Sequence, residues 1–311
     1  MMKKSFFLIL IPALWGIWAC ATSPSVNSSA DGPGQGDREL NRGIYWYQKG
    51  CSLKAMEHFH AAHEYYSLTD QQAGVARSLN GIANGYRQAG KTEDARLFYD
   101  AAIAVARRCD DQRVMAQAMS NKAAMLLESD DLAGAEVLLD EAQLLARETG
   151  PVYAMVLNHR AELLMKANRT DEAMTLLDQA DSATDGGGFN ADAAIHFTRG
   201  RLMMKIGNFS EAMSHFQQAL VLDRHAGFSR GMADDLSAMA VIHEQLGEDE
   251  AALDCLDRSI KIHALLENRE KVLENLGRLE SLAQKTGTDV RVTVHFINQW
   301  LAGDTIDAIC R

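Results

Sequence analysis

The sequence predicts an all-α protein made of repeated helical hairpins, and three observations support this prediction. The chain of 311 residues contains only 4 Pro, and it is rich in Ala, Leu, Met, Glu, Gln and Arg, which favour helices. It is 47% hydrophobic, which is too apolar for a disordered chain, and it has too few β-branched residues for a β-sandwich. An internal repeat of about 40 residues then indicates the architecture.

The net charge limits the class of partner. The chain carries 31 basic and 42 acidic residues, which gives a formal charge of −11 at pH 7. A chain this acidic repels phosphates, so we expect no nucleic acid partner.

The first twenty residues are typical of a secretory signal. Lys3 and Lys4 precede a short apolar run from Phe6 to Trp18, and small residues follow near the end of the run. The run is too short to cross a membrane as a mature helix. We therefore predict that residues 1–19 are a signal peptide that is removed.

The end of this signal resembles the bacterial lipobox, in which an aliphatic residue and a small residue precede a lipid-modified cysteine. Ile17, Ala19 and Cys20 match that pattern. The resemblance implies that Cys20 carries several acyl chains, which give stable anchoring. The following residue is Ala21 rather than Asp, which implies the outer membrane, with the protein facing the periplasm. The alternatives are ordinary cleavage to a soluble secreted protein and an uncleaved anchor.

A polar linker is expected after the signal. Residues 20–37 begin with Cys20 and continue with Ser, Gly, Pro and Asn without an apolar period. Such a chain is a flexible coil with a reach of about 20–25 Å, long enough to act as a tether.

Six gapless copies of one hairpin follow the linker. They cover residues 43–62, 83–102, 123–142, 161–180, 200–219 and 240–259. Each copy has a turn residue that tolerates a positive φ, namely Gly50, Gly90, Asp130, Asn168, Gly207 and Gly247. Five residues later each copy has alanine, namely Ala55, Ala95, Ala135, Ala173, Ala212 and Ala252. A large apolar residue follows, namely Phe59, Tyr99, Leu139, Leu177, Phe216 and Leu256. A small residue at the same position of every copy lets two helices approach closely, while a large apolar residue fills the groove between them.

This pattern resembles the tetratricopeptide repeat family, although the usual period is 34 residues. The resemblance implies a right-handed α-solenoid of about six hairpins over residues 38–266, with a concave groove lined by the first helix of each pair. Residues 267–311 are expected to form C-terminal capping helices. Within them, Asn268–Lys285 is amphipathic, and Asp289–Leu301 fits either a helix or a strand, of which we favour the helix.

The family geometry implies which residues face the groove. The expected partner-binding residues are Arg77, Asn80, Asn84, Arg87, Asn121, Asn158, His159, Glu162, Arg201 and Lys205. Asn side chains offer a donor and an acceptor, which matches an extended peptide backbone. Basic residues outnumber acidic ones on these faces once Lys166 and Glu128 are included, which favours an acidic ligand.

Signals for chemistry are weak. Gly186-Gly187-Gly188 lacks the strand and the Lys-Ser/Thr of a phosphate loop, so we expect an inter-repeat loop. His60 and His63 are close enough on a helix to chelate a metal, yet the outer face of a second helix is ordinarily solvated. We expect no catalytic residue, no metal site, no cofactor and no small-molecule substrate.

Four cysteines remain after Cys20. Cys51 and Cys109 fall at opposite ends of the hairpin arms, too far apart to bridge. Cys255 and Cys310 would meet if the C-terminal tail folded back, and the alternative is that both are free thiols.

The sequence therefore favours an interaction scaffold that is anchored in the bacterial cell envelope and binds a protein or peptide in its groove. A self-associating or soluble secreted structural protein is the main alternative. A metal-dependent enzyme is the less favoured one.

Overall fold

The computed structural model describes residues 34–146, 150–184, 189–303 and 310. The predicted signal peptide, Cys20, most of the predicted linker and the triple glycine at 186–188 lie outside these residues. Helix α1 begins at Gln35, inside the predicted linker, so the last residues of that segment are helical and not coil.

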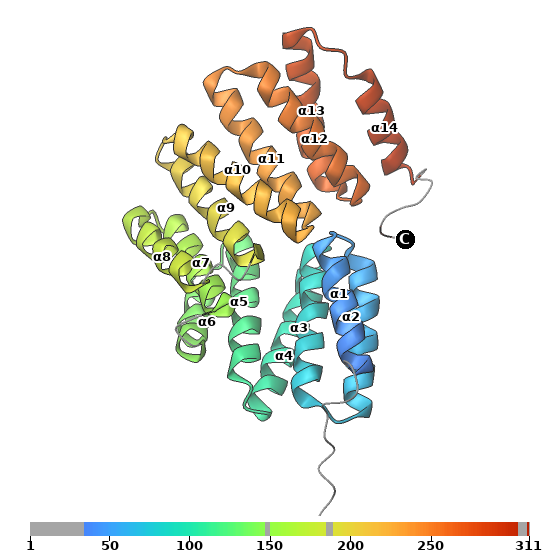
Figure 1. Ribbon diagram of the computed structural model, residues 1–311, viewed down its shortest axis with the longest axis vertical. Helices are drawn as coiled ribbons and strands as arrows, with labels where there is room; N and C mark the ends of the chain where they lie inside the picture. Colours follow the sequence, from blue (N-terminus) through green and yellow to red (C-terminus); the bar gives the residue numbers. More distant parts are fainter. Residues whose placement is uncertain (1–33, 147–149, 185–188, 304–309, 311) are drawn as a thin grey trace, which may run out of the picture. The chain divides into compact units, whose positions relative to one another are not determined.

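The described residues form helices and no strand (Figure 1). The helices are α1 Gln35–Gln48, α2 Ser52–Leu68, α3 Gln72–Gln88, α4 Thr92–Arg108, α5 Gln112–Glu128, α6 Leu132–Leu145, α7 Pro151–Lys166, α8 Thr170–Ala183, α9 Phe189–Lys205, α10 Phe209–Ala226, α11 Ser229–Leu246, α12 Asp249–Leu265, α13 Arg269–Thr286 and α14 Arg291–Leu301. Helices α1 to α12 pair as six hairpins, which confirms the predicted solenoid. Helices α13 and α14 follow as the C-terminal pair, and the helical interpretation of residues 289–301 is confirmed.

The predicted turn residues end the first helix of each hairpin. All six have a positive φ: Gly50, Gly90, Asp130, Asn168, Gly207 and Gly247. Gly and Asn or Asp adopt this left-handed conformation at low cost, and it reverses the chain into the second helix.

In the first and fifth copies, the large apolar residue packs against a glycine of the first helix. Phe216 is fully buried, and a Cβ added to Gly200 would lie 2.7 Å from its ring. Phe59 has the same relation to Gly43, with a separation of 2.4 Å. Glycine at these two positions is therefore required by the close approach of an aromatic ring.

The buried apolar residues form two main clusters. The N-terminal core extends from α1 to α7 and includes Phe59 and Leu139, while the C-terminal core extends from α7 to α14 and includes Phe216 and Leu256. Helix α7 contributes to both, with Val156 in the first core and Leu157 in the second. Helix α7 is thus the element that joins the two cores.

Turns from the two cores also contact each other directly. Arg230 Nη1 donates to the Gln88 carbonyl oxygen at 3.3 Å. A Cβ added to Gly50 would lie 2.8 Å from a methyl group of Leu266. The first two hairpins therefore contact helix ends of the sixth hairpin.

A disulfide bond joins Cys51 to Cys310 across 259 positions of sequence. Of the two alternatives for Cys255, the free thiol is confirmed, since Cys255 is buried in α12 and unbridged; the expectation that Cys310 bridges Cys255 or stays free is wrong, because Cys310 pairs with Cys51. Cys109 is also free, as expected from its distance to Cys51. Cys51 lies in the α1–α2 turn, which Leu266, at the end of α12, contacts at Gly50.

Candidate functional site

A cavity of about 570 Å³ lies along the inner faces of α1, α3, α5, α7 and α9. We call it the groove pocket. Eight of the ten predicted groove residues line it: Arg77, Asn80, Asn84, Arg87, Asn121, Asn158, His159 and Glu162. Arg201 and Lys205 do not. Their side chains pair with Glu162 and with the Met165 carbonyl oxygen respectively, so we do not place them in the pocket wall.

Side-chain amides supply much of the polar lining, because five Asn and two Gln border the cavity. Asn121 Nδ2 donates to Asn80 Oδ1 at 3.2 Å, which holds both amides in place. The Tyr99 hydroxyl donates to Asn84 Oδ1 at 2.6 Å and leaves the Asn84 amide N–H groups available. Asn158 is 2% exposed, and its Oδ1 has no hydrogen-bond partner among the described residues. Such fixed amides suit a peptide backbone, which presents alternating donors and acceptors.

Apolar side chains occupy the spaces between the amides. Ile44 lines the pocket and is 42% exposed, and Met155 and Phe197 border it from α7 and α9. Phe228, in the turn before α11, closes the lining from the C-terminal core. The pocket therefore offers apolar contact as well as hydrogen bonds, which is typical of a ligand site.

His159 contributes a neutral hydrogen-bonding group. Its Nδ1 lies 2.8 Å from Ser120 Oγ, and the ring is buried. Burial lowers the pKa of His159 to about 4. The ring is therefore uncharged at neutral pH and adds no positive field to the pocket.

The predicted basic excess of the groove is mostly offset inside the protein. Arg87 lies 3.9 Å from Glu128 and donates to the Asn121 carbonyl oxygen. Lys166 pairs with Asp130. Arg77 lies 3.7 Å from Asp37. An ion pair has little net field at a distance, so these cations attract an acidic ligand less than their number implies.

One cation of the pocket was missed by the sequence reasoning. Arg113 lies in the first turn of α5, is exposed, and has no hydrogen bond or ion pair to any described residue. Its spacing was informative, because Arg113, Gln117 and Ser120 follow at i, i+4 and i+7 and so share one helix face. Arg113 is therefore the pocket cation best placed to meet an acidic group of a ligand.

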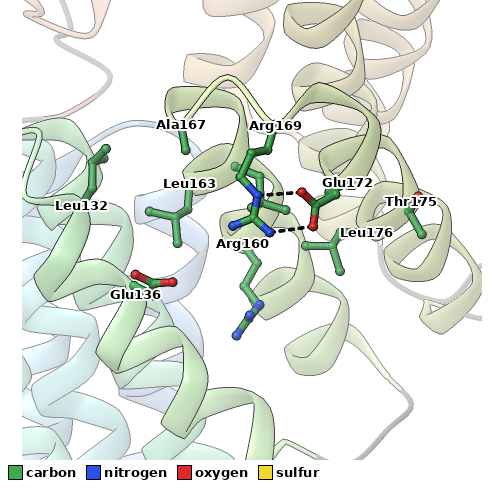
Figure 2. A pocket seen from close by; sticks show the side chains of 10 residues that line it. Leu132, Glu136, Arg160, Leu163, Ala167, Arg169, Glu172, Thr175 and Leu176 are labelled. Atoms are coloured by element: carbon green, nitrogen blue, oxygen red, sulfur yellow. Dashed lines mark hydrogen bonds and ion pairs between the residues drawn. The ribbon is translucent and has the colours of Figure 1, made fainter.

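A second cavity of about 380 Å³ lies between α6, α7 and α8. Figure 2 shows Arg169 and Glu172 side by side in its wall, where Nε and Nη2 of the arginine donate to the carboxylate, each at 2.6 Å. Arg160 is paired with Asp140. Because both of its arginines are already paired, this cavity offers an anionic ligand fewer unused cations than the groove pocket.

The described residues place no three His, Cys, Asp or Glu side chains where they would hold a metal ion. On the same helix as His60 and His63, His58 Nδ1 lies 2.7 Å from Glu39 Oε2. The same residues contain no helix that is both long and apolar enough to span a bilayer.

Two segments match the tetratricopeptide repeat family, at residues 75–108 and 193–226. These segments cover the hairpins α3–α4 and α9–α10. No curated protein matches the chain. These two segments are therefore similar to tetratricopeptide repeats, a repeat type that generally mediates protein–protein interactions and is generally not enzymatic.

The chain is similar to solved structures of low sequence identity. A Rap protein complexed with Competence and Sporulation Factor is 16% identical and has a TM-score of 0.57, with 81% of this chain and 75% of that chain covered. A thermophilic tetratricopeptide repeat protein of Thermus thermophilus is 18% identical with a TM-score of 0.48, over 63% of this chain and 98% of that one. At these identities the first likeness supports the solenoid of hairpins and nothing about ligands.

Proposed function

We propose that this protein is an interaction scaffold of the bacterial cell envelope that holds an extended segment of another protein in its groove pocket. The observation that carries the proposal is the lining of that pocket. Fixed amides of Asn80, Asn84 and Asn121 alternate with apolar side chains from five successive inner helices. A peptide backbone uses the amides, and its side chains use the apolar spaces.

An acidic residue or a terminal carboxylate in the partner would pair with Arg113, which has no described partner within the protein. The other cations contribute less because they are already paired. A scaffold also fits the repeat type, since stacked helical repeats present an extended concave surface to a partner.

Photo-crosslinking in cells tests whether the pocket is occupied. We expect a photoreactive residue in place of Ile44, in the pocket, to give a discrete crosslinked partner. The matched control replaces Leu97, which is 64% exposed on α4 and does not line the pocket. If both positions give the same products, or Ile44 gives none, the pocket is not the binding site.

The proposal includes a lipid anchor at Cys20, followed by a short tether. The support is the sequence alone: an apolar run, the lipobox residues Ile17 and Ala19, and a polar segment that leads into α1. Ala21 after the cysteine favours the outer membrane, with the helices facing the periplasm.

Replacing the anchor cysteine tests this part. We expect Cys20→Ser to move the protein from the membrane fraction to the soluble fraction, because several acyl chains hold a protein where none or one does not. Cys109→Ser, which changes a free cysteine of the α4–α5 turn, is the control and should leave the distribution unchanged. A Cys20→Ser protein that still sediments with membranes would contradict lipidation.

A further inference from the structure

The fifth hairpin holds two histidines that face each other. His196 lies on α9 and His215 on α10, and these two helices lie side by side (Figure 1). The Nδ1 atoms of the two rings are 3.1 Å apart, and both rings are partly buried. Neither ring lines the groove pocket, so the histidine pair is separate from the site described above.

The other copies of the hairpin show what residues these two positions ordinarily hold. The first copy has Glu39 and His58, which form an ion pair at 2.7 Å. The remaining four copies have apolar residues or a cysteine, namely Leu79 with Phe98, Met119 with Leu138, Leu157 with Leu176 and Leu236 with Cys255. Apolar side chains fill such a space between two helices without any hydrogen bond. The hairpin therefore does not need two imidazoles at these positions to fold.

The separation of the two nitrogens matches two ligands of one metal ion. An imidazole nitrogen binds Zn²⁺ at about 2.0–2.1 Å, so two such nitrogens at an angle of about 90–110° lie about 2.9–3.4 Å apart. The observed 3.1 Å falls within this range. A hydrogen bond between the rings of His196 and His215 has the same length, so it gathers the two ligands before an ion binds.

Two carboxylates near the pair suit a cation. Oε1 of Glu211 lies 3.9 Å from Nε2 of His215, the nitrogen that points away from His196. A carboxylate on the second nitrogen is the usual partner of a histidine that binds a metal, because it fixes the ring with its proton on that nitrogen. Asp192 precedes His196 by one helical turn, and its buried Oδ1 has no hydrogen-bond partner among the described residues. A bound cation or its water would give this oxygen a partner.

The positive charge closest to this pair is already balanced. Arg199 follows His196 on α9, and its guanidinium lies 2.9 Å from Asp178 and 3.6 Å from Asp181. An arginine between two carboxylates repels a second cation only weakly. Arg199 therefore does not exclude a metal ion from the histidine pair.

We propose that His196 and His215 bind one divalent transition-metal ion, such as Zn²⁺ or Cu²⁺, through their Nδ1 atoms. Water fills the remaining coordination positions. Both rings bind as neutral imidazoles with the proton on Nε2, so the ring that donates at Nδ1 in the free protein moves that proton to Nε2 through solvent, and no proton is released. Imidazole nitrogens suit Zn²⁺, Cu²⁺ and Ni²⁺, whereas Ca²⁺ and Mg²⁺ prefer oxygen ligands. The bound ion joins α9 to α10.

Isothermal titration calorimetry of the full chain in detergent with zinc chloride tests the site. We expect the wild type to bind one ion at this site, and we expect His196→Leu and His215→Leu each to lower the affinity at least about tenfold. Leucine is the residue that the fourth copy has at both positions, so each variant should keep the helical circular dichroism of the wild type. His63→Ala is the matched control, because it removes a partly buried histidine of α2 that is outside the pair, and it should leave the affinity unchanged.

Three results would overturn the proposal. They are a wild type that binds no Zn²⁺, binding that both leucine variants leave unchanged, and a loss of affinity in His63→Ala as large as in His196→Leu. Electron paramagnetic resonance of the wild type with one equivalent of Cu²⁺ gives a second answer if the leucine variants do not accumulate. Coupling of the copper to two imidazole nitrogens is expected, and coupling to fewer rejects the site.

Discussion

Phe216→Ala is expected to lower the free energy of unfolding by about 3–5 kcal/mol. Phe216 is fully buried in α10, and its ring fills the space that Gly200 leaves open on α9. Its removal leaves a cavity that the neighbouring helices cannot close, because the ring also packs edge-on against Phe197. Urea unfolding followed by circular dichroism measures the loss.

Phe296→Ala is the matched control for that experiment. Phe296 is 43% exposed on α14 and stacks on Trp300, so its truncation should cost less than about 1 kcal/mol. Equal effects of the two substitutions would show that the repeated large column is not the source of the stability of the solenoid.

Asp235→Asn should stabilise the protein increasingly as the pH rises above about 6. Asp235 is 1% exposed, and neither carboxyl oxygen has a hydrogen-bond partner among the described residues. Burial, with Asp223 and Asp234 nearby, raises the pKa of Asp235 to about 9. The folded state then keeps a proton that the unfolded state has lost, so stability falls with rising pH between the two pKa values.

The expected size follows from that linkage. The free-energy gap between Asp235→Asn and the wild type should grow by up to about 1.4 kcal/mol per pH unit, because the amide has no proton to lose. Asp223, whose pKa burial raises to about 7, contributes in the same direction. Burial lowers the pKa values of His159 and His263 to about 4. Below about pH 6.5 these two histidines therefore make the stability rise with pH, which opposes the effect of the two aspartates. The fall should therefore be clearest from about pH 6.5 to 9.

Thermal unfolding at pH 6, 7, 8 and 9 measures this dependence. Asp254→Asn, an exposed carboxylate of α12 that is paired with Arg258, is the control and should leave the pH profile unchanged. A parallel profile for Asp235→Asn and the wild type would mean that Asp235 is ionised in the folded state.

The hairpins were predictable because each one is specified by its own residues. The alanines from Ala55 to Ala252 are buried because a helix can approach another closely only where side chains are small. The turn residues were predictable for a similar local reason, since a positive φ favours Gly, Asn and Asp. The geometry implied by the tetratricopeptide resemblance also placed eight groove residues on one cavity.

The junction between the first and last hairpins was not predictable in this way. Small rotations between successive repeats add up, and their sum decides whether Gly50 meets Leu266. The pairing of Cys51 with Cys310 depends on the same sum, so the sequence did not indicate it. The pairing of the groove cations with acidic residues was also not predictable from single repeats, because pairs such as Lys166 with Asp130 join different repeats.

The central claim is that the groove pocket holds a partner segment, and one crosslinking measurement tests it most directly. The yield from a photoreactive residue at position 44 is compared in otherwise wild-type, Arg113→Gln and Arg108→Gln cells. Both substitutions remove one exposed positive charge, but only Arg113 lines the pocket. We expect Arg113→Gln to lower the yield about tenfold, the loss of one charged hydrogen bond, and Arg108→Gln to leave it unchanged. Equal yields in all three strains would contradict the claim.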